Sequence, residues 1–141
     1  MKQSVTVAGL AAFCVASFFV RAQGRASTRD GVYTEAQATR GQASYKTACA
    51  SCHGQALGGG GAATPPLAGE DFMMNWSGQT LDELFERIQT SMPADHPGSL
   101  SRAANADIVA YILKANKLPP GKNDLPSDAE ALKQIQIEVA K

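Results

Sequence analysis

The chain has 141 residues, a length that suits a single domain. Its 13 basic and 13 acidic side chains balance. No cluster of Lys and Arg occurs, which excludes a polybasic protein that binds nucleic acid or membranes through charge.

The first 22 residues have the composition of an export signal. Lys2 gives a positive start, an apolar run extends from Val5 to Val20, and Ala22 is a small residue suited to a signal-peptidase site. Cleavage there would leave a periplasmic protein with 11 basic and 13 acidic side chains, a net charge of −2. The alternative is an uncleaved anchor that holds the protein at the membrane, although the run is short for a membrane span.

The next segment, residues 23–33, is polar and mixed, and we expect it to form a linker. A first helix is predicted to begin after Thr34, because Gln37 follows at the spacing of a capping box. The residues that then recur three and four apart, and so share one helical face, are Ala38, Gly41, Tyr45, Ala48 and Cys52. Glycine is a poor helix former, so Gly41 indicates either a close packing partner or a tolerated surface position.

The end of this helix carries the motif Cys49-Ala50-Ser51-Cys52-His53. Two thiols at this spacing lie about one helical turn apart, so both can bond to the vinyl groups of one porphyrin, and the histidine can bind its iron. We therefore expect one covalently bound haem c. The alternatives are a disulfide between Cys49 and Cys52 and a metal site. A zinc site would need further ligands, and the only other histidine is His96.

Two further helices are predicted beyond a loop. Residues 54–70 are rich in Gly and Pro and lack periodicity, which indicates the loop. A second helix begins at Thr80, where Glu83 closes a capping box. Its apolar stripe consists of Leu81, Leu84, Phe85 and Ile88. After a second loop at residues 91–99, a third helix is predicted from about Ser101 to Lys117.

The last segment, residues 119–141, is a polar C-terminal extension with one short helix predicted from about Asp128 to Gln134, capped by Ser127 and Glu130. Its role is open: it covers the domain, docks a partner or is disordered. The folded domain is expected at residues 34–118 and is all-α, with about three core helices. These helices bury little surface, so a haem packed among them would supply the missing apolar core.

The sixth ligand of the iron decides between electron transfer and ligand chemistry. A His/Met pair fills both axial positions and favours electron transfer. We expect Met92 to be this ligand, because it lies in the loop between the second and third helices, where Pro93 stiffens the chain. Met73 and Met74 are expected to fill the core, and His96 to be a surface loop residue.

The chain resembles class I monohaem cytochromes c over about residues 34–118. The matching features are Gly41 and Tyr45, Cys49-Ala50-Ser51-Cys52-His53-Gly54, Pro65-Pro66-Leu67-Ala68-Gly69, Met92-Pro93 and Tyr111 in the last helix. Within that family it is most similar to the cytochrome subunits that accept electrons from quinoprotein (PQQ) dehydrogenases. The resemblance implies that Gly41 and Tyr45 pack the first helix against the last one, near Tyr111.

The same resemblance implies a small class I cytochrome c fold around one haem c. The function would be electron transfer, without enzymatic activity of its own, in the periplasm. The donor would be a dehydrogenase, such as a quinoprotein, and the acceptor a terminal protein such as an oxidase.

Roles at the haem follow from the resemblance as well. Pro65 would offer its carbonyl to the ring N–H of His53, which fixes the orientation of the ring. Leu67 would line the haem pocket, and Trp76 would donate its indole N–H to a haem propionate. The alternative for Trp76 is a core aromatic residue without such a contact.

Two other functions are compatible with the motif. An open-site haem peroxidase or ligand-binding protein would need a free sixth position and a distal acid or base such as His96. A structural role would use the haem as a folding staple within a larger redox assembly. The electron carrier is expected to dock through an uncharged patch and to show weak salt dependence. That patch is expected to comprise Ala50, Ser51, Gln55, Ala56, Pro93 and Ala94.

Overall fold

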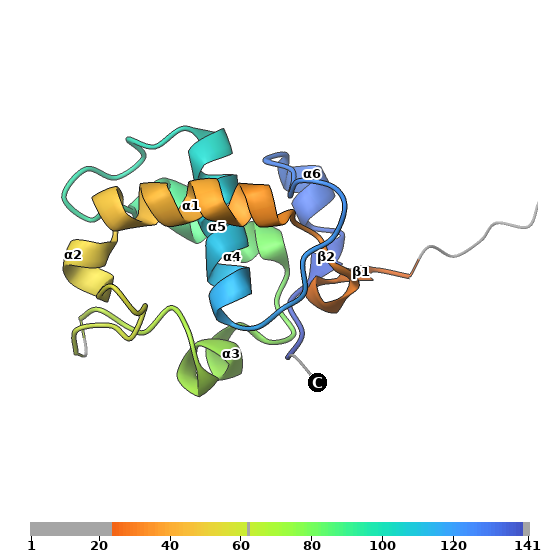
Figure 1. Cartoon of the computed structure of the whole chain (residues 1–141), viewed down its shortest axis with the longest axis horizontal. Coiled ribbons are helices and arrows are strands. Elements are labelled where there is room, and N and C mark those ends of the chain that lie inside the picture. The colour runs from red at the N-terminus through yellow and green to blue at the C-terminus, as the bar shows by residue number, and fades with distance from the viewer. Residues whose placement is uncertain (1–23, 62, 140–141) are drawn as a thin grey trace, which may run out of the picture.

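The computed structural model describes residues 24–139 except residue 62, so the expected export signal lies outside the described residues. The helices are α1 (Glu35–Ala48), α2 (Ala50–His53), α3 (Glu70–Trp76), α4 (Leu81–Ser91), α5 (Arg102–Ala115) and α6 (Ala129–Leu132), and the short elements are β1 (Ala26–Ser27), η1 (Thr28–Asp30) and β2 (Ile135–Gln136). The predicted all-α class is therefore confirmed (Figure 1). Over the described part of the chain, no helix is long and apolar enough to cross a membrane.

Helices α1 and α5 cross with their backbones in contact at Gly41. A Cβ atom at this position would lie 1.8 Å from the backbone oxygen of Asp107, a distance that no side chain tolerates. One turn further along α1, the ring of Tyr45 packs against Tyr111 with 5.3 Å between the ring centroids. The expected packing of the first helix against the last is confirmed.

The helix starts follow the predicted caps. Thr34 accepts a hydrogen bond from the backbone N–H of Gln37 at 3.1 Å, and α1 begins at the next residue. The backbone N–H of Thr80 donates to Glu83 Oε2 at 3.0 Å at the start of α4. The apolar stripe predicted for α4 is buried throughout, at Leu81, Leu84, Phe85 and Ile88.

Helix α3 was not predicted, and it corrects the expectation for one methionine. With seven residues, the helix is too short to show a periodic pattern. Its two turns bury Phe72 and Met73 on one face, as expected for Met73. Met74 lies on another face and is 73% exposed, so the expectation that it fills the core is wrong.

The two ends of the described chain, residues 24–33 and 119–139, pack together as a terminal strap. Strands β1 and β2 pair in parallel, and the Gly121 N–H donates to the Tyr33 carbonyl at 2.6 Å. Residues 24–33, which we expected to form a linker, therefore belong to the packed domain. Their close fit to the extension is clearest at Gly121, where a Cβ atom would lie 1.8 Å from the Gly31 oxygen.

The C-terminal part of the strap covers the helices. Its apolar residues Leu125, Leu132, Ile135 and Ile137 are buried. Its helix α6 is shorter than predicted, and its cap is Asp128 instead of Ser127, because Asp128 Oδ1 accepts from the Ala131 N–H at 3.0 Å. This burial shows that the described part of the extension covers the domain, which is one of the three roles that the sequence left open.

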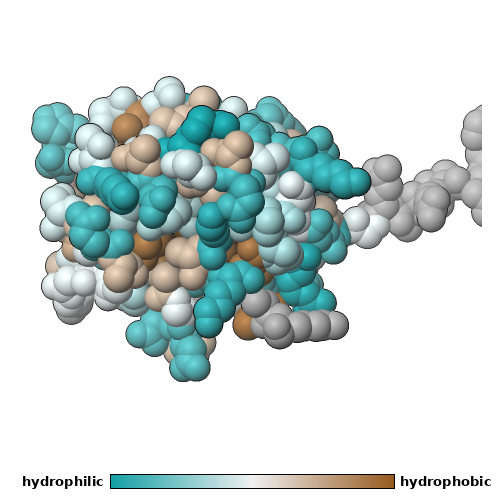
Figure 2. Space-filling view, in the orientation of Figure 1, coloured by the Kyte–Doolittle hydropathy of each residue, from teal (hydrophilic) through white to brown (hydrophobic). Residues whose placement is uncertain are grey.

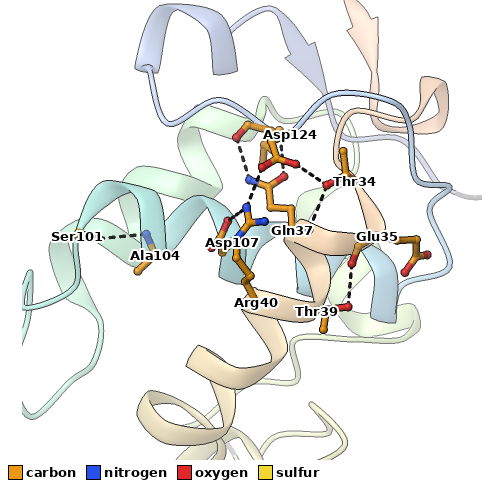
Figure 3. A network of polar contacts seen from close by, with 10 residues as sticks. Thr34, Glu35, Gln37, Thr39, Arg40, Ser101, Ala104, Asp107 and Asp124 are labelled. Carbon is orange, nitrogen blue, oxygen red and sulfur yellow. Dashed lines mark hydrogen bonds and ion pairs between the residues drawn. The ribbon is translucent and has the colours of Figure 1, made fainter.

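Polar contacts join the strap to α1 and α5 (Figure 3). The guanidinium of Arg40 donates from Nε and Nη2 to both oxygens of Asp107, each at 3.0 Å, and from Nη2 to Asp124 at 2.8 Å. The other oxygen of Asp124 accepts from the Thr34 hydroxyl. The hydrogen bonds from Thr34 and then Arg40 hold the pKa of Asp124 below its ordinary value, and those to Asp107 and Asp124 raise the pKa of Arg40.

We call α1, α5 and the terminal strap the frame. Its buried glutamine, Gln37, makes two side-chain bonds to the backbone of Leu125, at 3.0 Å to the carbonyl and 2.6 Å from the N–H. The surface seen over α1 and α5 is mostly hydrophilic, with small and scattered apolar areas (Figure 2). The frame is therefore closed by contacts within the chain itself.

Candidate functional site

The two motif cysteines lie where α1 turns into α2. Cys49 caps the end of α1 and is half-buried, whereas Cys52 is exposed on α2. Both are free thiols and are not joined in a disulfide. Burial, and to a smaller extent the charge of Cys52, raises the pKa of the Cys49 thiol. The pair is therefore available for covalent attachment of a group that lies against α2.

His53 ends α2, and one hydrogen bond orients its ring. The residue is 8% exposed, and its Nδ1 lies 3.0 Å from the Pro65 carbonyl oxygen. A carbonyl oxygen only accepts hydrogen bonds, so Nδ1 donates to it, and Nε2 is the ring nitrogen left for another partner. This is the contact that the resemblance implies for Pro65, and a bond of this kind orients a histidine ring that binds a metal.

The loop at residues 54–69 is fixed to the frame by side chains. The Tyr45 hydroxyl donates to the Gly54 carbonyl at 2.7 Å, just after α2. Further along, Asn116 at the end of α5 donates from Nδ2 to the Leu67 carbonyl at 3.0 Å and accepts from the Gly69 N–H at 3.0 Å. Leu67, expected in the haem pocket, is half-buried and packs against the core.

Sequence reasoning missed Asn116. Its position just after the third predicted helix signals at most a helix end, and its partners lie 47 and 49 residues away along the chain. The residue is only 7% exposed, so its amide groups need these partners. Asn116 is thus the buried side chain that fixes the segment containing Leu67.

Trp76 is the last residue of α3 and is half-buried. Its ring packs near Phe72 with 6.2 Å between the ring centroids. Among the hydrogen bonds of the described residues, none comes from the indole N–H, so this donor is free to contact a bound group. The packing fits a core aromatic residue, and the free donor fits the expected contact with a propionate.

Met92 caps the end of α4 and begins the loop at residues 92–100, which we call the Met92 loop. The thioether side chain is half-buried and packs against the core. The backbone N–H of Met92 donates to Ile88 O at 3.0 Å, and its carbonyl accepts from Gly98 at 3.3 Å. By contrast, the side chain of His96 is 78% exposed and lies 3.3 Å from Asp95 Oδ2, as expected for a surface loop residue.

We call α2, residues 54–69, α3 and the Met92 loop the haem face. Figure 1 shows α2 and the loop between α4 and α5 at one end of the view, and β1 and β2 at the other. Several apolar residues of this face, together with Cys49 just before α2, pack against the core but stay partly exposed; those of the face are Leu67, Ala68, Trp76, Met92 and Leu100.

These residues fit a haem c. The planar, apolar macrocycle would cover the partly exposed side chains, the two thiols would attach it, and His53 nitrogen and Met92 sulfur are an axial pair known for haem iron. For the part of the chain that the structure describes, no group of three or more His, Cys, Asp and Glu side chains could hold another metal ion. The zinc alternative therefore has no support among these residues.

The surface next to the attachment site carries little charge. A groove of about 360 Å³ lies between α1 and the end of the Met92 loop and is lined by Ala43, Ser44, Thr47, Ala48 and Leu100. Of the uncharged residues expected in the docking patch, Ser51, Gln55, Ala56 and Ala94 are exposed and Pro93 is half-buried. Ala50 is only 6% exposed, because it packs into the core, so it does not belong to the patch.

Comparisons with known proteins agree with this geometry. The family model described as cytochrome c oxidase, cbb3-type, subunit III matches residues 36–112, more than half of the chain. The crystal structure of the sulfane dehydrogenase SoxCD from Paracoccus pantotrophus is similar, with a TM-score of 0.50 and 24% sequence identity over 70% of this chain. This likeness shows the fold alone, and the chain covers 52% of that longer chain. No curated protein matches the sequence.

Proposed function

This chain belongs to the cytochrome c family described as cytochrome c oxidase, cbb3-type, subunit III, and on that premise we propose that it is a periplasmic electron carrier. Membership of the family means that it carries covalently bound haem c and transfers electrons. The finer proposal is that His53 and Met92 bind the iron, and that the carrier works between a dehydrogenase and a terminal acceptor.

Each site residue has a defined task in this proposal. When bound, haem c supplies a one-electron couple at its iron. Cys49 and Cys52 would hold it through thioether bonds. His53 would bind the iron through Nε2, and Met92 would bind it through its sulfur. A His/Met pair would favour electron transfer over ligand chemistry.

The observation that carries the proposal is the bond between His53 Nδ1 and the Pro65 carbonyl, 3.0 Å long. A buried histidine directly after a free cysteine pair, with its ring oriented through Nδ1 and with Nε2 left for another partner, is suited to metal binding. Two further residues would surround the bound group: Leu67 would line the pocket, and Trp76 would donate to a propionate.

The partners are proposed from the surface and from the similar proteins. The family is named for an oxidase subunit, which supports an oxidase-type acceptor. The proposed donor is a dehydrogenase, such as a quinoprotein, as the resemblance in the sequence implies. The exposed residues Ser51, Gln55, Ala56 and Ala94 carry no charge. Docking through them should depend weakly on ionic strength, and a steep fall of the electron-transfer rate with added salt would contradict this.

Axial ligation is tested by visible spectroscopy of the oxidised holoprotein. A weak absorption band at the red end of the spectrum reports a bond from methionine sulfur to ferric iron. We expect this band in the wild type and in His96→Ala, and its loss in Met92→Ala. If Met92→Ala keeps the band, another group binds the iron and the proposed ligand is wrong.

The open-site alternative is less well supported by the geometry. It needs a distal acid or base near the iron, and His96 is exposed to solvent beside Asp95. A band that is absent already in the wild type, together with rapid binding of cyanide, would favour this alternative over the electron carrier.

A further inference from the structure

A buried pair of amide side chains links α5, α4 and the end of the Met92 loop. Asn105 on α5 is fully buried, and its Nδ2 donates to Gln89 Oε1 on α4 at 2.8 Å. Gln89 Nε2 in turn donates to the Leu100 carbonyl at 3.4 Å. We call Asn105 and Gln89 the amide clasp.

The amide clasp is not explained by stability alone. Asn105 Oδ1 is buried and has no hydrogen-bond partner among the described residues. A buried acceptor without a partner destabilises the folded state, whereas an apolar side chain of similar size would have no such cost. A polar residue at this core position therefore calls for a role beyond packing.

The clasp acts where the two ends of the Met92 loop meet. Gln89 precedes Met92 by three residues on α4, and the Gly98 N–H donates to the Met92 carbonyl at 3.3 Å. At the near end of the loop the Met92 N–H donates to Ile88 O, and the remaining backbone bonds, from His96 to Pro93 and from Ser99 to His96, lie within the loop. Among the described residues, the bond from Gln89 to Leu100 is thus the polar side-chain contact that ties the far end of this loop to a helix.

We propose that Gln89 and Asn105 are positioning residues that keep the Met92 loop closed and so hold the methionine sulfur at the iron. This rests on the proposed function, in which Met92 is the sixth ligand. Because the bond to Leu100 is long, the loop opens at the clasp without unfolding of the frame.

Loop opening is measurable in the oxidised holoprotein with imidazole as the probe. Imidazole binds the iron only when the Met92 sulfur has left, so its apparent affinity scales with the fraction of molecules whose loop is open. We expect Gln89→Leu, which removes both bonds of the clasp, and Asn105→Leu, which removes the bond to Gln89, each to raise this affinity about tenfold. Loss of the red-end band during the titration reports the exchange of ligands.

Two further variants separate positioning from stability. Gln37→Leu removes the buried glutamine of the frame, whose amide holds the backbone of Leu125. It should lower the urea midpoint and leave imidazole affinity within about twofold of the wild type, because the loop bonds are intact. The double variant Gln89→Leu/Asn105→Leu removes both amides together, so neither is left without its partner. Its stability in urea should recover relative to the single variants, while its imidazole affinity stays raised because the loop is open.

The outcomes are distinct. The inference is wrong if both clasp variants bind imidazole with wild-type affinity. It is also wrong if Gln37→Leu, at the same loss of stability, raises imidazole affinity as much as the clasp variants do. If the double variant recovers wild-type imidazole affinity along with stability, the clasp is purely structural and the inference is also wrong. A wild type that lacks the red-end band shows instead that Met92 is not the ligand, which is a failure of the proposed function.

Discussion

The frame and the haem face are closed in different ways. In the frame, backbones touch at Gly41 and at Gly121, and the buried amide of Gln37 finds both of its partners. On the haem face, apolar side chains such as Leu67 and Met92 pack against the core and stay partly exposed. The chain completes the frame by itself and leaves the haem face to be completed by the haem.

This difference leads to a separation of effects. A substitution in the frame should lower the free energy of unfolding and leave the haem spectrum unchanged. A substitution on the haem face should change the spectrum or the reduction potential, since hydrogen bonds and solvent exposure around the iron set the potential. The four predictions that follow test this separation.

The largest expected effect is that of Gly41→Ala in the frame. The added Cβ would lie 1.8 Å from the Asp107 backbone oxygen, so α1 and α5 must move apart. We expect a loss of about 3 kcal/mol in the free energy of unfolding, measured with urea on the holoprotein, with the red-end band retained. The control is Gly58→Ala, where nothing lies within 4 Å of the added atom and the change should stay within about 0.5 kcal/mol. Equal losses in the two variants would contradict contact between the backbones.

Asn116→Leu should affect both regions. It leaves the Leu67 carbonyl and the Gly69 N–H without their partners, and we expect a loss of about 2 kcal/mol. Because Leu67 belongs to the haem face, the reduction potential should shift as well. The exposed Asn123→Leu is the matched control and should change neither quantity. A loss of stability at an unchanged potential would assign Asn116 to the frame alone.

The sequence predicts the parts of the fold whose cause is local. The caps at Thr34 and Thr80 need only residues three positions away, and the stripe of α4 repeats within one helix. Glycine weakens a helix, so Gly41 indicates either a close neighbour or a tolerated surface position, and the resemblance to class I cytochromes c favours the close neighbour. The strap cannot be predicted in this way, because β1 and β2 are two residues each and pair across the whole length of the domain.

The same limit applies to the candidate site. Cys49, Cys52 and His53 form a contiguous motif, so sequence suffices to find them. The partners of Asn116, in contrast, are chosen by the fold: the sequence shows an asparagine near a helix end, and only the packing of α5 on residues 67–69 gives it two bonds outside its own helix. The exposure of Met74 is also decided by which face of α3 meets the core.

Tyr45 belongs to both regions and should give a smaller effect. Its ring packs on Tyr111 in the frame, and its hydroxyl donates to the Gly54 carbonyl on the haem face. Tyr45→Phe removes only the hydroxyl, so we expect a loss of about 1 kcal/mol in urea unfolding. Tyr111→Phe, whose hydroxyl makes no hydrogen bond among the described residues, should be neutral. If the two variants lose equal stability, the bond to Gly54 does not contribute.

The pH dependence of this bond follows from the same burial. Burial, and then the charges of Cys49 and Tyr111, raises the pKa of Tyr45 from its ordinary value of 10.0 to about 12. A pKa that is raised on folding gives stability that is complete below pH 10.0 and is lost as the pH rises through about 12. The difference in urea midpoint between wild type and Tyr45→Phe should therefore shrink across this interval.

Asp124→Asn gives the smallest expected effect on stability. The pH dependence of the Asp124 contribution is opposite to that of Tyr45, because stability is lost as the pH falls. The hydrogen bonds from Thr34 and then Arg40 lower the pKa of Asp124 from its ordinary value of 3.8. Its contribution to stability is therefore present above pH 3.8 and is lost as the pH falls through the lower pKa of the folded state. Because the Asp124 side chain is 49% exposed, solvent screens the pair and the gain is small.

The measurement is the Tm of the holoprotein between neutral pH and about pH 3, an interval that spans the ordinary pKa of aspartate. The Tm of the wild type should exceed that of Asp124→Asn at neutral pH, and the two should converge in acid. Asp95→Asn, a change at a 77% exposed carboxylate whose ion-pair partner is His96, is the control and should follow the wild type. Retention of the red-end band in Asp124→Asn at every pH where the protein is folded would show that the frame and the haem face loosen separately. If Asp124→Asn instead loses the band at a pH where its Tm has not yet fallen, the strap influences the ligation of the iron.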